Sequence, residues 1–393
     1  MTRTDPDSGR GPQPGGGTAG RAPEASAPGA AAPSAASRAA GARDPGASRE
    51  TGAGRGTARA AGRAPGSAGA EPPSSAGAEA PAPPVLAEVV RSGFAESRHR
   101  GSLVLLAADG GEVLALGDVT SPVGPRSANK PFQAAAMLRA GAPLAGEQLA
   151  VAAGSHAGEP FHLERVAEIL AAAGLREADL HNPSAPPLDP VEAEALLASG
   201  GRPSRVTMNC SGKHAGMLAA CVAAGWPVEG YLSPEHPLQR LVSAEVADAT
   251  GEPVAHTGTD GCGAPVLAVS LTGLAHAYRR CVLAEPDTPR RRVADAMRAH
   301  PEYVGGTRRH DTWLMRGLPG ALAKMGAEGV QAVALPDGRA LALKIEDGAA
   351  RAVGPVLRRA LRLLGVDGSL PGLLGDAPVH GGGFRVGEIR ASF

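Results

Sequence analysis

The pattern of hydrophobic and polar residues changes near residue 83, and regular structure is predicted only after that point. Residues 1–82 consist almost entirely of Ala, Gly, Pro, Ser, Thr and Arg, with no run of large apolar side chains. Such a segment buries too little apolar surface to offset the conformational entropy lost on folding. We therefore predict a disordered low-complexity tail over residues 1–82 and one folded domain over residues 83–393.

Strand patterns occur at both ends of the folded region. Short apolar runs bounded by turn residues predict strands at Val85–Ser92, Ser102–Ala107 and Glu112–Leu116. Two more are predicted at Gly329–Leu335 and Ala340–Ile345, joined by a Pro-Asp-Gly turn. Because these strands flank a long middle section, we expect both ends of the domain to share one antiparallel sheet beside a helical region, which is an α/β fold.

The middle of the chain has the spacing of apolar residues that is typical of helices. The predicted helices span Ala128–Ala140, Leu163–Ala173, Pro190–Ala198, Gly212–Ala224, Pro237–Thr250, Pro265–Leu283 and Pro289–Arg298, with an Arg-rich amphipathic helix at Ala349–Leu364. Binding sites in such folds are commonly found between the sheet and the helices. A site is therefore expected at that junction.

Composition argues against several classes of partner. The chain has 39 basic and 39 acidic residues, and aromatic residues make up 3%. A net charge of zero with few aromatic side chains favours neither a nucleic-acid surface nor a polybasic membrane face. No window reaches the roughly 18 apolar residues of a membrane span, and the first residues lack the pattern of a secretory signal. We expect a cytoplasmic protein without nucleic-acid or membrane partners.

Lysine is rare in this chain and is therefore informative. Only four of the 39 basic residues are lysines: Lys130, Lys213, Lys324 and Lys344. Arginine stays protonated in proteins, whereas lysine can lose its proton and act as a base or a metal ligand. The remaining lysines are therefore the first candidates for chemistry.

Ser127 and Lys130 lie three residues apart at the start of a predicted helix. That spacing places them on one helix face, and the helix N-terminus offers free N–H groups and a positive dipole end. This arrangement suits a serine nucleophile that a neutral lysine deprotonates, with an oxyanion stabilised nearby. A capping serine followed by an ordinary helical lysine is the alternative, which the scarcity of lysine disfavours.

Two of the four cysteines also lie near predicted helix starts. Cys210 and Lys213 repeat the three-residue spacing, and Cys262 follows in a glycine-bracketed turn that is expected to open another helix. Two thiolates and a neutral amine can form three corners of a tetrahedral zinc site, whereas buried thiols are the alternative. Cys221 and Cys281 lie in apolar helical stretches and are interpreted as packing residues.

Other polar segments have simpler interpretations. The loop His156–His162 contains two histidines and a glutamate, but local hydrogen bonding is favoured there over a metal site. Lys324 is predicted to precede a strand. Lys344, at the end of a predicted strand, is best explained by a charge pair with Glu346 or Asp347.

Eight short motifs occur in order along the folded region: SANKP, SHAGEPFH, NCSGKHAGM, DGCGAP, VGGTRRHDT, KMGAEG, KIEDGAAR and VGEIR. Together they resemble the asparaginase II family of thermolabile, rhizobial-type L-asparaginases, from about Val85 to Arg390. The resemblance implies a fold similar to serine β-lactamases and penicillin-binding proteins. It further implies a homodimer, zinc binding, and hydrolysis of L-asparagine to L-aspartate and ammonia by residues 83–393.

The resemblance also implies which residues form the site. These are Ser127 with Lys130 and Ser155 with Lys324 for catalysis; Cys210, Lys213 and Cys262 with a water for zinc; and Arg126, His214 and Asp260 near the substrate. Asparagine is a zwitterion, so Arg126 would hold its α-carboxylate and Asp260 its ammonium group. Zinc would orient the pocket and its waters.

One segment departs from the family pattern. Arg308 stands where a glycine is expected, and Asp311 stands where some relatives carry a cysteine. The backbone path of the loop Gly305–Thr312, and any contact of this loop with substrate, are therefore open.

Rival functions come from three directions. A glutaminase would use nearly the same chemistry. A penicillin-recognising acylase or β-lactamase also begins from Ser-x-x-Lys, but the chain contains neither Lys-Thr-Gly nor Ser-Asp-Asn. Outside the enzymes, the alternative is a non-catalytic zinc-binding scaffold that uses the tail for interactions. The retention of Lys130 and Lys324 argues against a scaffold.

Overall fold

The structure is a computed structural model that describes residues 82–366, 374 and 377–393. Apart from Ala82, the predicted tail over residues 1–82 lies outside the described residues. In this part of the chain, no helix combines the length and the apolar character that a membrane crossing requires.

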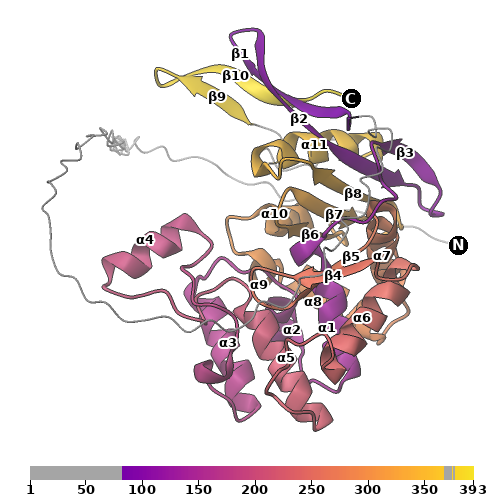
Figure 1. The fold of residues 1–393 in the computed structure, drawn as a ribbon. Helices are drawn as coiled ribbons and strands as arrows, with labels where there is room; N and C mark the ends of the chain where they lie inside the picture. Colours follow the sequence, from indigo (N-terminus) through magenta and orange to yellow (C-terminus); the bar gives the residue numbers. More distant parts are fainter. Residues whose placement is uncertain (1–81, 367–373, 375–376) are drawn as a thin grey trace, which may run out of the picture. The chain divides into compact units, whose positions relative to one another are not determined.

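The main sheet joins the two ends of the described domain (Figure 1). In spatial order its strands are β6 (Leu322–Gly326), β7 (Val330–Ala334), β8 (Ala340–Ile345), β2 (Phe94–Leu106), β1 (Val85–Arg91), β10 (Phe384–Ala391) and β9 (Pro378–Gly381), with β3 (Glu112–Leu116) paired to β2. All of these pairings are antiparallel. The predicted α/β class, with one antiparallel sheet from both ends of the domain, is confirmed.

Strand β2 changes character along its length. Its first half alternates between exposed and partly buried residues, whereas Gly101–Leu106 is buried throughout. The buried half pairs with β8 in a register that places Leu103 opposite Leu343. Continuous burial indicates cover on both faces of the sheet. Helix α7 (Leu271–Leu283) packs on β2, β7 and β8, and helix α11 (Ala350–Leu363) packs on β1, β7, β8 and β10.

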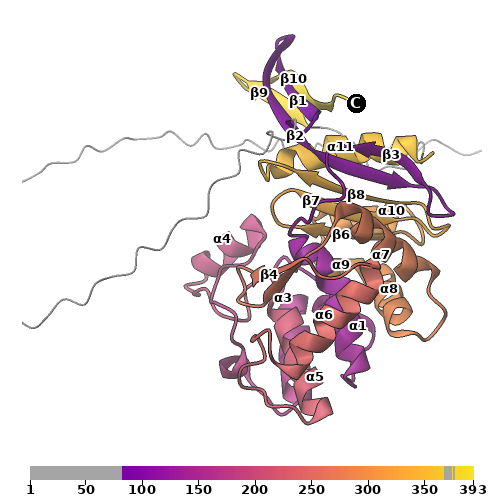
Figure 2. The same cartoon turned by 45° about the vertical axis from the view of Figure 1, so that its right-hand side comes forward.

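The helical region lies beside the β6 edge of the sheet (Figures 1 and 2). Its helices are α1 (Lys130–Arg139), α2 (Gly146–Ala152), α3 (Pro160–Ala172), α4 (Pro190–Ala198), α5 (Ser211–Ala224), α6 (Pro237–Thr250), α8 (Pro289–Ala299), α9 (Pro301–Gly305) and α10 (His310–Gly317), with 3-10 turns at Arg126–Asn129 and Glu177–Asp179. Helix α1 contacts α2, α5, α6 and α8, and Lys130–Leu138 is buried. The helix that carries Lys130 is therefore central to this region.

Two sequence predictions need correction at the junction. The predicted helix Pro265–Leu283 is wrong in its first part, because Pro265–Ala268 forms strand β5, paired with β4 (His256–Thr259). The Ser270 hydroxyl accepts the Gly273 N–H at 2.8 Å, and this N-cap fixes the start of α7 at Leu271. The turn containing Cys262 therefore closes a hairpin and does not open a helix.

The second correction concerns Lys324, which precedes strand β7 as predicted but itself lies within a strand that was not predicted, β6. Strand β6 is at the end of the sheet path and lies directly against the 3-10 turn that contains Ser127. A Cβ atom at Gly326 would collide with the carbonyl oxygen of Pro125. Glycine at this position therefore permits the close approach of the sheet edge to the predicted nucleophile.

Candidate active site

The predicted site residues converge from separate segments onto the junction between sheet and helices. They come from the 3-10 turn before α1, the loop after α2, the start of α5, the β4–β5 turn and strand β6. In Figure 2, β4, α1 and α5 lie below β6. Most of the side chains involved are buried, so their charges are only weakly screened by water.

Lys130 lies at the centre of this cluster. Its Nζ donates to the Gly154 carbonyl at 2.5 Å, to Ser155 Oγ at 3.0 Å and to Cys210 Sγ at 3.2 Å. Burial lowers the pKa of Lys130, and the charge of nearby Lys213 adds to this effect, while the Cys210 thiolate opposes it. One amine therefore joins a predicted catalytic serine to a predicted zinc ligand.

Ser127 is placed differently from Ser155. It lies in the 3-10 turn Arg126–Asn129 and is partly exposed, and no described hydrogen bond joins its Oγ to Lys130. The preceding Arg126 has a φ of 52°, in the left-handed region that is uncommon for residues other than glycine. Such backbone conformations cost free energy and cluster at functional sites. In this structure Lys130 is paired with Ser155, and Ser127 presents a free hydroxyl next to a strained residue.

Arg126 and Asp260 are paired with each other. The Arg126 Nε and Nη2 atoms donate to Asp260 Oδ1 at 2.9 and 2.7 Å. Burial opposes ionisation of Asp260, but the hydrogen bond from Arg126 and the charge of Lys213 hold its pKa below the ordinary value. Both side chains are partly exposed, so a ligand can reach them.

The three predicted zinc ligands lie together. Lys213 Nζ donates to Cys262 Sγ at 3.0 Å, and both cysteines belong to one small buried cluster. A hydrogen bond with Cys262 lowers the pKa of Cys210 well below its usual value, with help from Lys130 and Lys213 and against the effect of burial. By contrast, burial alone raises the pKa of Cys221 to about 11. The pKa of cysteine is therefore lowered at Cys210 and raised at Cys221.

This donor set fits zinc in its chemistry. Two sulfur atoms and one amine nitrogen are ligands that zinc accepts. The lysine is essential to the fit, because among the described residues no group of three His, Cys, Asp or Glu side chains could hold a metal ion. His214 follows Lys213, and its Nδ1 is hydrogen-bonded to the Tyr231 hydroxyl at 2.8 Å. Its buried Nε2 has no hydrogen-bond partner among the described residues.

Lys324 has a partner that the sequence did not reveal. Its Nζ donates to Asp311 Oδ2 at 3.1 Å and to the Met325 carbonyl at 2.9 Å. No hydrogen bond to Ser155 is present among the described residues. The pKa of Lys324 is lowered to about 8. Burial is the main cause, Asp311 opposes the shift, and the charge of Lys130 adds to it. Asp311 was visible in the sequence only as a departure from the family pattern.

Arg308, the other departure, points away from the site residues. Its guanidinium donates to Asp189 at 2.9 Å and to Glu192 at 2.6 Å, at the start of α4. Thr307 donates through its N–H and hydroxyl to Glu159. These bonds fix the loop against α4, and Arg308 contacts none of the predicted catalytic residues.

The simpler polar segments resolve in different ways. His156 is hydrogen-bonded to Ser211 at 2.8 Å and His162 to the Glu302 carbonyl at 2.8 Å, so this loop is held by hydrogen bonds to distant segments as well as within itself. Burial lowers the pKa of both histidines. The predicted charge pair of Lys344 is wrong, because its Nζ donates instead to the main-chain carbonyls of Glu328, Ile345 and Glu346. The packing role of Cys221 and Cys281 is confirmed by their complete burial in the main core.

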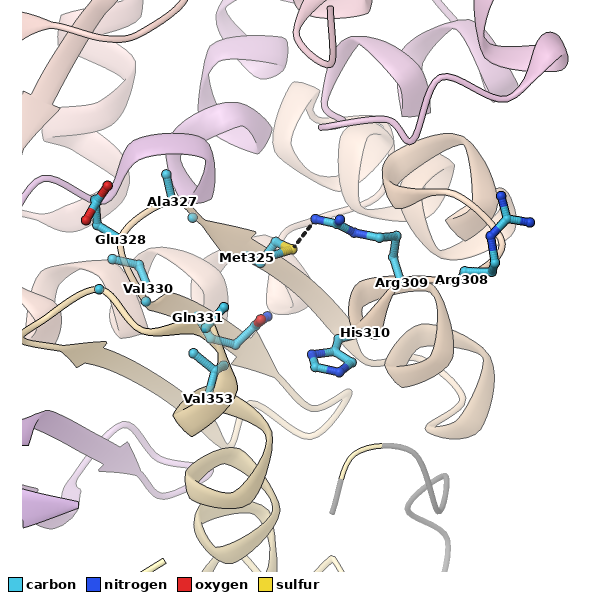
Figure 3. A pocket seen from close by; sticks show the side chains of 13 residues that line it. Arg308, Arg309, His310, Met325, Ala327, Glu328, Val330, Gln331 and Val353 are labelled. Carbon is cyan, nitrogen blue, oxygen red and sulfur yellow. Dashed lines mark hydrogen bonds between the residues drawn. The ribbon is translucent and has the colours of Figure 1, made fainter. Parts of the chain in front are cut away.

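A pocket of about 290 Å³ lies next to this site (Figure 3). Its lining residues are Arg308, Arg309, His310, Met325, Gly326, Ala327, Glu328, Gly329, Val330, Gln331, Gly348, Ala350 and Val353. In Figure 3 the Arg309 guanidinium reaches across to Met325 Sδ, at 3.0 Å. None of the predicted catalytic or zinc-binding residues lines this pocket, but Gln331 connects it to Asp311.

Comparison with solved structures gives matches of low similarity. The crystal structure of Mglu in its native form is 16% identical, with a TM-score of 0.36, and the match covers 67% of this chain and 63% of Mglu. The chain thus spans slightly less than two thirds of Mglu. A β-lactamase from Mycobacterium bovis is 16% identical over 63% of this chain and 88% of that one, with a TM-score of 0.35. A β-lactamase from Burkholderia vietnamiensis is 17% identical over 67% and 92%, with a TM-score of 0.34.

These similarities carry no argument about function at such TM-scores. A search among curated protein sequences found no match. The sequence profile described as L-asparaginase II matches residues 87–391, which includes all of the site residues considered above. Because the match spans well over half of the chain, the protein belongs to the L-asparaginase II family.

Proposed function

We propose that the protein hydrolyses L-asparagine to L-aspartate and ammonia by acyl transfer through a serine that a lysine deprotonates. Membership of the family supports an amidohydrolase type of activity. The observation that carries the mechanism is the buried Lys130, which follows Ser127 by three residues, whose amine lies 3.0 Å from the Ser155 hydroxyl and whose pKa is lowered by burial. A lowered pKa makes the neutral amine, which is the form that acts as a general base, more accessible.

Recognition of asparagine begins with the Arg126–Asp260 pair. A zwitterionic amino acid carries one carboxylate and one ammonium group, which are the partners of these two side chains. Binding would exchange one ion pair for two, with the α-carboxylate on Arg126 and the α-ammonium on Asp260. The pair is partly exposed and adjoins Ser127, so this exchange would bring the side-chain amide towards the serine.

Each proton transfer in the proposed reaction is carried out by a named side chain. Neutral Lys130 takes the proton of the Ser127 hydroxyl as its oxygen attacks the amide carbon. The resulting C–N bond cleavage releases ammonia, with a proton supplied by the lysine pair Lys130 and Lys324. Water then cleaves the acyl ester on Ser127, which regenerates the hydroxyl and releases aspartate. Ser155 would relay protons between the two amines.

Ser155 is the alternative nucleophile, and a specific contact favours it. Lys130 donates to Ser155 Oγ, whereas Ser127 has no described hydrogen bond to Lys130. If Lys130 deprotonates the serine that it contacts before substrate binds, Ser155 would carry the acyl group. The two serines are distinguishable by trapping the acyl-enzyme and locating the modified residue by mass spectrometry.

Zinc would be held by Cys210, Lys213 and Cys262. When bound it would fix the positions of these three side chains and so orient the pocket and its waters. Lys213 must be neutral to serve as a ligand, and both thiols must be deprotonated, so binding would weaken as the pH falls. Lys130 donates to Cys210 and therefore connects the metal ligands to the serines. We also include a cytoplasmic location and a homodimer in this proposal.

Steady-state ammonia release tests the proposal. We expect turnover of L-asparagine that exceeds turnover of L-glutamine, measured with and without added zinc. Faster release from glutamine would identify a glutaminase. Hydrolysis of a chromogenic β-lactam without ammonia release from asparagine would identify a penicillin-recognising enzyme. A lack of turnover of all three substrates would leave a non-catalytic zinc-binding protein.

A further inference from the structure

The carboxylate of Asp311 is buried and is surrounded by hydrogen-bond donors. Its Oδ2 accepts from Lys324 Nζ at 3.1 Å and from the Met325 N–H at 3.0 Å. Its Oδ1 accepts from Gln331 Nε2 at 3.2 Å. Asp311, Lys324 and Gln331 have no exposed surface. An asparagine would present one acceptor oxygen and one NH₂ donor group, so donors at both oxygens favour aspartate over its neutral amide.

This network fixes the Lys324 amine from two sides. Asp311 comes from α10, Met325 from the edge strand β6 and Gln331 from β7, so three elements hold the carboxylate in place. The amine has two protein acceptors, Asp311 Oδ2 and the Met325 carbonyl. A protonated lysine has three N–H donors, which leaves one for a substrate or water.

A structural role alone explains this pair poorly. Buried ion pairs often contribute little net stability, because desolvation of both charges offsets their attraction. Lys324 is also close enough to the other buried amine for the charge of Lys130 to lower its pKa. We propose that Asp311 is a positioning residue, which holds the amine of Lys324 in place for its part in the reaction with Lys130 and Ser155. This inference rests on the proposed function of those three residues.

Several charged or titratable groups surround the pair and bear on its pH dependence. Those that act on Lys324 are Asp311, Lys130 and Arg309, and those that interact with Asp311 besides Lys324 are Tyr278 and His310. Asp311 raises the pKa of Lys324, so its removal lowers that pKa below about 8. Loss of the carboxylate should therefore move the Lys324-dependent limb of the pH–rate profile to lower pH.

The experiment compares Asp311→Asn, Asp311→Glu, Lys324→Gln and the double variant Asp311→Asn/Lys324→Gln. We expect Asp311→Asn to lower kcat about 10- to 100-fold through misplacement of the amine, with KM little changed. Asp311→Glu keeps the charge and should recover part of this loss with the wild-type pH profile. The double variant should be no slower than Lys324→Gln alone, because both changes act through one amine.

A matched control separates positioning from stability. Glu245 is also buried and pairs with Arg290 at 2.6 Å, on α6 and away from the serines. Glu245→Gln should lower the melting temperature without moving the pH–rate profile. An Asp311→Asn enzyme that is folded by circular dichroism but has wild-type kcat and pH profile would overturn the proposal, as would additive effects in the double variant.

An activity-independent measurement uses the scarcity of lysine. Biosynthetic labelling of lysine ε-carbons gives signals from only four residues, and Lys324→Arg identifies the one from Lys324. Its titration midpoint should fall by at least ~1 pH unit in Asp311→Asn and stay near wild type in Asp311→Glu. An unchanged midpoint in Asp311→Asn would refute the positioning role. If the wild-type enzyme released no ammonia, the proposed function would fail, whereas this titration would still decide whether Asp311 controls Lys324.

Discussion

The helix side and the strand side of the junction both bury lysines, but they give them different partners. On the helix side, Lys130 and Lys213 contact a hydroxyl and two sulfur atoms. On the strand side, Lys324 contacts a carboxylate that is itself held by two other donors. Hydroxyl and thiol groups can exchange protons or bind a metal, whereas a paired carboxylate mainly fixes a charge in place. On this comparison, the helix side holds the proposed base and metal ligands, and the strand side holds the Lys324 amine in place through a carboxylate.

The same contrast separates the cysteines. A hydrogen bond with Cys262 strongly lowers the pKa of Cys210, with help from Lys130 and Lys213, while burial in the main core raises the pKa of Cys281 to about 12. Burial by itself disfavours the thiolate. An adjacent amine does not decide the outcome alone, because Cys262, which accepts from Lys213, has a raised pKa owing to its hydrogen bond with Cys210 and its burial.

The largest expected effect on turnover comes from substitution of Lys130, at the centre of the helix side. Lys130→Arg keeps a positive charge but removes the capacity to act as a base, since a guanidinium does not lose its proton. We expect ammonia release from asparagine to fall by several orders of magnitude at neutral pH. Lys344→Arg is the matched control, because Lys344 bonds only to main-chain carbonyls, and it should keep near wild-type turnover. Substantial activity in Lys130→Arg would show that charge alone is required.

The two serines give the next test. Ser127→Ala should reduce kcat by roughly 10³-fold or more and leave the circular dichroism spectrum unchanged, since one small hydroxyl is lost. Ser155→Ala removes the hydrogen-bond partner of Lys130 and should reduce kcat less. A larger loss in Ser155→Ala than in Ser127→Ala would transfer the nucleophile to Ser155.

A smaller effect on turnover is expected from the metal ligands. Cys210→Ser or Cys262→Ser should reduce zinc from about one ion per chain to a trace, because a serine hydroxyl is a poor ligand for zinc. Substrate affinity should fall with it. Cys221→Ser is the control, since Cys221 lies in the apolar core, and it should leave zinc content unchanged. Full zinc occupancy in the Cys210/Cys262 double variant, by elemental analysis, would exclude this site.

The smallest expected effect concerns stability at alkaline pH. The pKa of Lys324 is about 8 in the folded protein and near its ordinary value of 10.5 when unfolded. Between these values the unfolded chain holds a proton that the native state lacks, so this group makes the native state more stable as the pH rises. Lys324→Met removes the contribution. The difference in unfolding free energy between wild type and Lys324→Met should therefore grow in favour of wild type from pH 8 to 10, by urea denaturation; a constant difference would mean that Lys324 titrates normally.

Local features of the fold were predictable because they depend on neighbouring residues. Helices Pro190–Ala198 and Pro237–Thr250 have the predicted bounds, since each begins with a proline at its first position and is capped by the preceding side chain. The helix predicted to begin at Pro265 is wrong over Pro265–Ala268, because the apolar run there is short enough for either a strand or a helix. Its pairing with the preceding strand decided between them.

The family, the short motifs that contain the site residues and the scarcity of lysine that marks them are all readable from the sequence alone. The contacts of Lys130 with Ser155, of Arg126 with Asp260 and of Lys324 with Asp311 follow only from tertiary packing. The motifs specify local backbone geometry over a few residues. A contact between side chains far apart in the sequence depends on how the sheet edge packs against the helices. The distance between these elements is set by the packing of the whole core.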